Sequence, residues 1–197
     1  MLNTILSKNQ KVKSRHLAGK KIYLFVAGIT IFAFAGCGNK KTDDNANANV
    51  PAGMIAADLS AISEGRMPIL INVPDSTVAP LDITANAQGG ADVKVGKNFQ
   101  ITVTGGEGNM AMKKSDITTD AVRKFVKYVV EDANALVWEW QIEGMEPEFH
   151  FYAIVKDGDK TFEVRDVEGE VFTEKAATQM LDAAKSIRLK APVKAES

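Results

Sequence analysis

Residues 149–167 of the chain read FHFYAIVKDGDKTFEVRDV, two apolar-rich runs on either side of a glycine turn. The runs 149–155 and 161–167 are rich in aromatic and β-branched residues, which favour strands. The turn Asp157-Gly158-Asp159 contains Asp-Gly, a strong hairpin signal, because glycine accepts the positive φ that a tight turn requires. The segment therefore predicts an antiparallel β-hairpin.

Further strands are predicted in the first half of the chain and just before this hairpin. Alternating runs at 91–95 and 99–104 flank another glycine turn and predict a second hairpin. A β-branched run bounded by prolines predicts a strand at 68–73. At 136–142 apolar and polar residues alternate again, which is the pattern of a strand with one buried face.

Apolar residues at helical spacing predict three helices. The first covers 54–64, and the second runs to about 131 from a cap at Ser115 or Asp116. The third follows Thr173, a residue type that caps helix starts. The order helix, strands, helix, three strands, helix predicts an α+β domain with a mostly antiparallel sheet of about five to six strands and two to three packing helices.

This element order and the opening segment Ile71-Asn72-Val73-Pro74-Asp75 loosely resemble the Mog1/PsbP-type sandwich. The resemblance implies that helices cover a central antiparallel sheet. It implies nothing about activity, because one fold supports many functions.

A basic and then apolar segment ends at Cys37, the only cysteine of the chain. Residues 1–21 hold six basic side chains and no acid, and residues 22–35 are almost wholly apolar but shorter than the roughly 20 residues of a spanning helix. The stretch Phe34-Ala35-Gly36-Cys37 resembles the lipobox of bacterial lipoprotein signal peptides. The resemblance implies removal of 1–36 and a diacylglycerol on the Cys37 thiol. The alternative is a cysteine that serves only as a small apolar residue.

Residues 37–53 contain few large apolar side chains and predict a flexible lipidated tether. Gly38 directly after the cysteine fits export to the outer membrane. The start of the tether also resembles the export signal of surface-exposed lipoproteins of Bacteroidota, and a plain solvated tether explains the same residues equally well. The residues that match the signal are Lys40, Lys41, Asp43 and Asp44.

Removal of residues 1–36 changes the net charge from −1 to −7, because that segment holds six basic side chains and no acid. An acidic protein argues against nucleic acid as a partner, since nucleic acid requires clustered Lys and Arg. After the tether we expect a single domain over 54–190 and a disordered tail over 191–197.

His150 is the only histidine after residue 36, so the sequence lacks the usual zinc ligand sets and histidine-based triads. We predict no metal and no cofactor. A catalytic histidine needs an orienting carboxylate and a nucleophile, and neither is visible nearby, so we expect a structural histidine on a sheet face. Glu143, Glu146 and Glu148 crowd one loop and would suit a hydrolase only if two carboxylates faced each other across a cleft.

Trp138 and Trp140 are two residues apart on a predicted strand, so both indoles point to the same sheet face. An open face would make them a stacking platform for sugars or peptide side chains. Leu136 and Ile142 continue the same face, and a continuous apolar face is usually packed, which favours the core.

These patterns favour a lipid-anchored, non-catalytic binding or assembly module at the outer membrane, with an envelope protein or a glycan as its partner. One alternative is a small envelope hydrolase or glycan-processing enzyme that uses Glu and Asp. The other is a carbohydrate-binding module that presents Trp138 and Trp140.

Overall fold

The computed structural model describes residues 50–62, 67–75 and 77–190 of the 197-residue chain. The predictions for the signal segment 1–36, for Cys37 and for the tail 191–197 lie outside these residues. All described residues belong to the compact unit Lys41–Ser197. Among them, no helix combines the length and the apolar character needed to cross a membrane.

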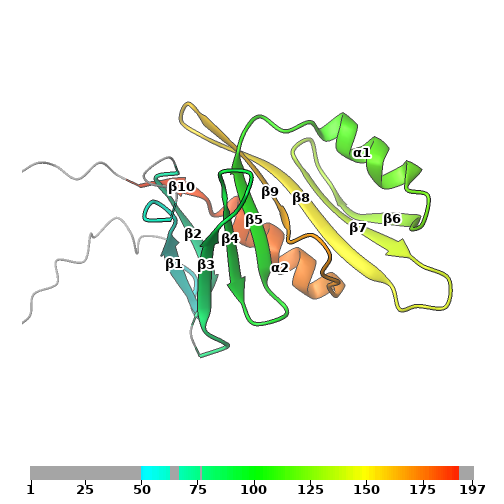
Figure 1. Ribbon diagram of the computed structural model, residues 1–197, viewed down its shortest axis with the longest axis horizontal. Coiled ribbons are helices and arrows are strands. Elements are labelled where there is room, and N and C mark those ends of the chain that lie inside the picture. The colour runs from blue at the N-terminus through cyan, green and yellow to red at the C-terminus, as the bar shows by residue number, and fades with distance from the viewer. Residues whose placement is uncertain (1–49, 63–66, 76, 191–197) are drawn as a thin grey trace, which may run out of the picture. The chain divides into compact units, whose positions relative to one another are not determined.

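Two antiparallel sheets make up most of this unit (Figure 1). The larger sheet has seven strands in the order β3-β4-β5-β9-β8-β7-β6, and the smaller has three in the order β1-β2-β10. The α+β class and the antiparallel pairing are therefore confirmed, although the strands form two sheets rather than one sheet of five to six. The strands are β1 (Met54–Asp58), β2 (Ile69–Pro74), β3 (Leu81–Ala85), β4 (Ala91–Val95), β5 (Gln100–Gly105), β6 (Lys124–Glu131), β7 (Ala135–Gln141), β8 (Glu148–Asp157), β9 (Lys160–Asp166) and β10 (Arg188–Leu189).

Helix α2 (Glu174–Lys185) packs on one face of the larger sheet, behind it in Figure 1. Thr173 caps this helix as predicted, because its side chain accepts a hydrogen bond from the Ala176 N–H. Met180 of α2 is fully buried in a core that it shares with Phe151 of β8. The smaller sheet contributes to the same core through Ile71 of β2.

Helix α1 (Met110–Thr119) covers part of the opposite face. Val137 of β7 belongs to the core beneath α2, whereas its neighbours Leu136 and Trp138 form a second buried cluster with Ile117 of α1. Successive strand residues point to opposite faces, so α1 and α2 enclose β7 and β8 between them.

The helix predicted to start at Ser115 or Asp116 starts earlier. Asn109 caps α1, because its side-chain oxygen accepts a hydrogen bond from the Met112 N–H. The helix ends at Thr119, and the carboxylate of Asp120 then accepts two backbone N–H groups of the following turn. The prediction that the helix continues beyond Thr119 is therefore wrong.

That second half is strand β6, which pairs with β7. Its register shifts twice, between Phe125 and Lys127 and between Tyr128 and Val130. Each bulge adds an extra residue on one strand, so the half-buried side chains of β6 lose their period of two and imitate helical spacing. The β-branched residues of this segment favour the strand conformation that the structure adopts.

The helix predicted over 54–64 is also wrong in its described part, because Met54–Asp58 is strand β1, paired with β2. Leu59, directly after β1, is fully buried, and its N–H donates to the Ile69 carbonyl oxygen. Tertiary pairing thus overrides the weak helical spacing of a short segment. Strands β3 and β10 were not predicted; β3 is an edge strand whose residues are all at least partly exposed.

Replacement of Thr173 by Ala removes the cap of α2. We expect the free energy of unfolding to fall by about 1 kcal/mol, because the first turn of the helix loses the acceptor for one of its N–H groups. Chemical denaturation followed by circular dichroism measures this loss. Thr173→Ser keeps the hydroxyl and is expected to retain most of the stability; an equal loss in both variants would contradict the capping role.

Candidate functional site

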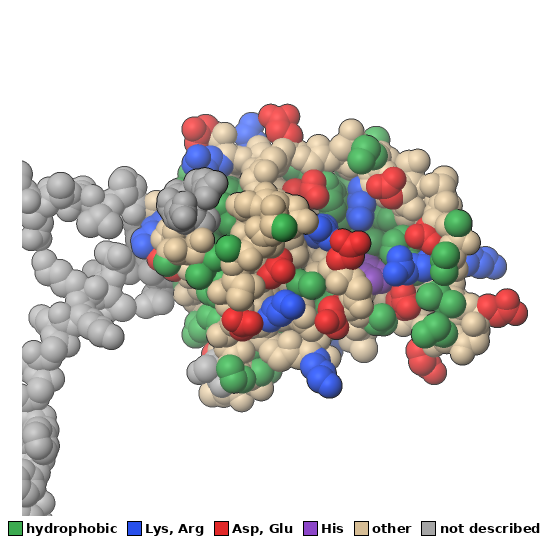
Figure 2. Space-filling model, in the orientation of Figure 1, with side chains coloured by type: hydrophobic (Ala, Val, Ile, Leu, Met, Phe, Trp, Pro, Cys, Tyr) green, Lys and Arg blue, Asp and Glu red, His purple; other side chains and the backbone are tan. Residues whose placement is uncertain are grey.

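A pocket with a volume of about 340 Å³ lies between α1 and the larger sheet. Helix α1 contributes Met112, Lys113 and Asp116, and Glu168–Glu170 after β9 complete the lining together with Asn109 and Arg123. Figure 2 shows acidic and basic side chains side by side on this face. The strand residues that line the pocket are Trp138, Trp140, His150, Phe151, Tyr152, Glu163, Arg165 and Asp166.

Strand register places most of these side chains together. Trp138 of β7 is opposite His150 of β8, and Tyr152 of β8 is opposite Arg165 of β9. These residues share the face that α1 covers, because the intervening Phe151 points to the core beneath α2. The hairpin β8–β9 and the strand β7 therefore build one polar and aromatic surface from three sequence segments.

His150 is 7% exposed, and its ring Nδ1 lies 2.7 Å from Oδ2 of Asp166. Oδ1 of Asp166 accepts a hydrogen bond from the Phe151 N–H. A proton on Nδ1 donates to the carboxylate, which orients the ring. The other nitrogen, Nε2, is buried without a hydrogen-bond partner among the described residues, 3.7 Å from Oε2 of Glu148. The structure therefore supplies the orienting carboxylate that the local sequence did not reveal.

Glu148 is the member of the predicted acidic loop that reaches this site. Its side chain is buried beside His150, and it also lies 3.4 Å from Nε of Arg123. Glu143 and Glu146 are exposed in the loop between β7 and β8 and do not line the pocket. In the ranges that the structure describes, no three His, Cys, Asp or Glu side chains are arranged to hold a metal ion.

Trp138 and Trp140 are 2% and 8% exposed and belong to the core beneath α1. Their rings meet edge to face, with centroids 5.4 Å apart and an interplanar angle of 79°. The indole N–H of Trp140 donates to the Ile117 carbonyl oxygen, whereas the Trp138 N–H is buried with no partner in the described part of the chain. A sugar platform needs open and roughly coplanar rings, which this pair does not present.

Lys113 extends from α1 over two aromatic rings. Its Nζ lies 5.3 Å from the ring centroid of Trp138 and 5.5 Å from that of Tyr152, distances typical of cation–π contacts. Nζ has no hydrogen bond or ion pair with another described residue, whereas Lys114 beside it is paired with Glu131. Burial lowers the pKa of Lys113, and the nearby Asp166 carboxylate partly opposes that shift.

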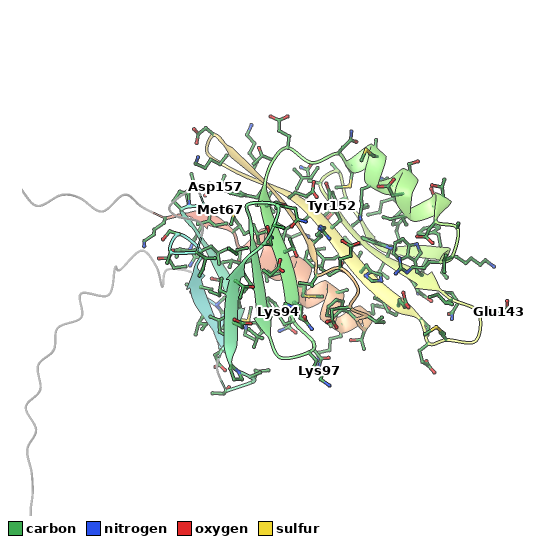
Figure 3. All side chains as sticks on the ribbon, in the orientation of Figure 1. Met67, Lys94, Lys97, Glu143, Tyr152 and Asp157 are labelled. Atoms are coloured by element: carbon green, nitrogen blue, oxygen red, sulfur yellow. The ribbon has the colours of Figure 1, made fainter. Side chains whose placement is uncertain are left out.

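Tyr152 joins three elements at the edge of the pocket (Figure 3). Its hydroxyl donates to Oε2 of Glu163 on β9 and accepts a hydrogen bond from the Asn109 N–H at the start of α1. Burial, reinforced by the bond to Glu163, raises the pKa of Tyr152 to about 12. Gly108 approaches this hydroxyl closely: at φ +60° a β-carbon there would lie 2.6 Å from it.

The raised pKa makes the contribution of Tyr152 to stability depend on pH. The unfolded side chain ionises around pH 10 and the folded one around pH 12, so the contribution is complete below pH 10 and is lost as pH rises towards 12. We therefore expect the difference in unfolding free energy between the wild type and Tyr152→Phe to shrink across this window. Urea denaturation at a series of pH values measures it, and a difference independent of pH would contradict the assignment.

Comparison with known proteins identifies no relative: the chain matches no family model, no curated protein and no solved structure. The resemblances to lipoprotein signal peptides and to the Mog1/PsbP-type sandwich therefore stay predictions. What the pocket can bind follows from its own residues.

Proposed function

We propose that this chain is a lipid-anchored envelope protein that binds a small ligand in the pocket beneath α1. Two buried polar atoms support the binding role most directly. Nε1 of Trp138 and Nε2 of His150 belong to residues that line the pocket, and neither has a hydrogen-bond partner in the described ranges.

Unpartnered atoms of this kind are unusual, because most buried polar groups in proteins are hydrogen-bonded. Each costs about 1–3 kcal/mol when it is left unsatisfied. A core that only had to be stable could replace both side chains by apolar residues. The same two residues line the pocket, so we infer that a bound molecule or an ordered water supplies the missing partners.

The anchoring part of the proposal comes from the sequence. The stretch that ends at Cys37 supports lipidation, and Gly38 supports an outer-membrane location, with either the periplasmic or the surface-exposed orientation. The partners we propose are thus the membrane lipid, through Cys37, and an envelope ligand in the pocket. The net charge of −7 after residue 36 favours neither nucleic acid nor an anionic membrane surface.

A second candidate is a small envelope hydrolase, which the contact between His150 and Asp166 favours. An oriented histidine can act as a general base, and Glu148 adds a second carboxylate beside the ring. The residues that line the pocket include no Ser, Thr or Cys, so in such an enzyme His150 would activate water rather than one of these side chains. The Trp138 N–H, unpartnered among the described residues, has no role in such a hydrolysis, whereas a bound ligand would give both it and His150 Nε2 a partner, so the binding role is the better supported.

Blocking the pocket tests the binding role. Saturation-transfer NMR with galactose, galacturonate and N-acetylated dipeptides, applied to the full chain in detergent, is expected to identify at least one binder. Asp116→Phe places a bulky ring on the pocket side of α1 and should abolish that signal. Ser115→Phe, one exposed position away and outside the pocket, should preserve it. Equal binding by both variants would show that the compounds bind elsewhere.

Lipidation is tested separately. We expect mass spectrometry of the membrane-extracted protein to show an N-terminal Cys37 that carries acyl chains, and Cys37→Ala to lose both the acyl mass and the membrane association. Two or more acyl chains hold a protein firmly, whereas one does so only marginally. A Cys37→Ala protein that stays on the membrane with an unchanged mass pattern would refute the anchor.

A further inference from the structure

The carboxylates inside the pocket have hydrogen-bond partners within the protein, whereas several of the pocket's donors have none in the described part of the chain. Both oxygens of Asp166 are occupied, one by the His150 ring and one by the Phe151 N–H. Glu163 accepts the hydroxyl hydrogen of Tyr152. Asp116, Glu168 and Glu170 are exposed at the rim. The carboxylates inside the pocket are therefore satisfied by the protein itself.

Several hydrogen-bond donors of the pocket, in contrast, have no partner within the described ranges of the protein. Lys113 Nζ carries up to three N–H groups and has no hydrogen bond or ion pair with another described residue, and the buried Trp138 N–H has no partner there. Arg165 has one ion pair, at 3.8 Å, with Glu168, whose side chain is 89% exposed. An ion pair of this kind contributes little, because water screens it.

The two cations are also close enough to affect each other. Burial lowers the pKa of Lys113 most, and the charge of Arg165 lowers it further. The carboxylates that oppose this shift in the pKa are those of Asp166, Asp116 and Glu163. An anion bound between Lys113 and Arg165 relieves the repulsion between these two cations and supplies hydrogen-bond acceptors at the same time. Nζ of Lys113 lies over the rings of Trp138 and Tyr152, so aromatic surface adjoins the charge.

We propose that the ligand of this pocket carries a carboxylate, which binds to Lys113 with Arg165 beside it. This inference rests on the proposed binding function and specifies its ligand class. A carboxylate fits better than a phosphate, because the acids at the rim repel a doubly charged anion more strongly than a singly charged one. Acidic sugars and free peptide C-termini share this chemistry.

Paired probes separate charge from shape. Galacturonate and galactose differ in their C6 group, a carboxylate in one and a hydroxymethyl in the other, and N-acetyl-dialanine and its C-terminal amide differ at the carboxylate. Inorganic phosphate serves as the competing anion. Titration of the full chain in detergent is followed by tryptophan fluorescence, since both tryptophans of the chain line this pocket, and by saturation-transfer NMR. We expect at least one acid to bind about tenfold or more tightly than its neutral counterpart and than phosphate.

Lys113→Met keeps a long, unbranched side chain at this position and removes the charge. We expect it to weaken binding of the acid by about tenfold or more while its melting temperature stays near that of the wild type. Lys113→Arg should retain part of the affinity. Lys114→Ala is the matched control, because Lys114 is on the same helix and outside the pocket, and it should bind as the wild type does.

The outcomes distinguish this inference from the function on which it rests. Equal affinity for an acid and its neutral counterpart, or tighter binding of phosphate, overturns the carboxylate while the pocket remains a binding site. Unchanged affinity in a folded Lys113→Met protein also overturns it. If no probe binds, charged or neutral, both proposals fall. The sugar and dipeptide pairs show which source of carboxylate the pocket accepts.

Discussion

Strand β8 is covered on both faces, and the arrangement of the other elements follows from this. Phe151 and Ala153 point into the core beneath α2, and His150 and Tyr152 point beneath α1. The polar side chains of a strand in this position cannot be solvated by water, so each needs a hydrogen-bond partner inside the protein. The hairpin supplies both partners from β9: Asp166 for His150 and Glu163 for Tyr152.

The same burial explains how α1 stays in place. The helix has only ten residues and includes Ile117, Thr118 and Thr119, whose β-branched side chains lower helix propensity. A helix of this length is marginal by itself. It is held by its contacts with the sheet, among them the bond from the Trp140 indole to the Ile117 carbonyl and the bond from Asn109 to the Tyr152 hydroxyl. The residues that hold α1 therefore also line the pocket beneath it.

Local signals were sufficient for part of this fold. Both hairpins and the strand at 136–142 follow from alternation and glycine turns, and the start of α2 follows from Thr173. Alternation fails at β6, where two bulges interrupt the period of two, and a sequence read without pairing cannot distinguish that pattern from a helix. The division into two sheets depends on long-range pairing, such as that of β10 with β2, which leaves no local signal.

The site was predictable to a similar degree. The continuous apolar face around Trp138 indicated a core position, and the structure places both tryptophans there. The carboxylate beside His150 was missed because it is 16 residues away. The hairpin around Gly158 contained the signal, since pairing outward from that turn aligns Tyr152 with Arg165 and brings Asp166 next to His150. Lys113 gave no signal, because its position depends on how α1 packs on the sheet.

The net charge of the chain after residue 36 and the two cations Lys113 and Arg165 in the pocket have opposite effects on an anion, which narrows the class of ligand. The part of the chain after residue 36 has a net charge of −7 and repels polyanions at long range, and the exposed acids at the rim add to this. Salt screens those exposed charges over about 10 Å, whereas Lys113 and Arg165 act at contact distance beside buried aromatic rings. A small anion with one charge is repelled only weakly as it approaches, and it gains the contact with the two cations. A nucleic acid or an anionic bilayer cannot enter a pocket of about 340 Å³.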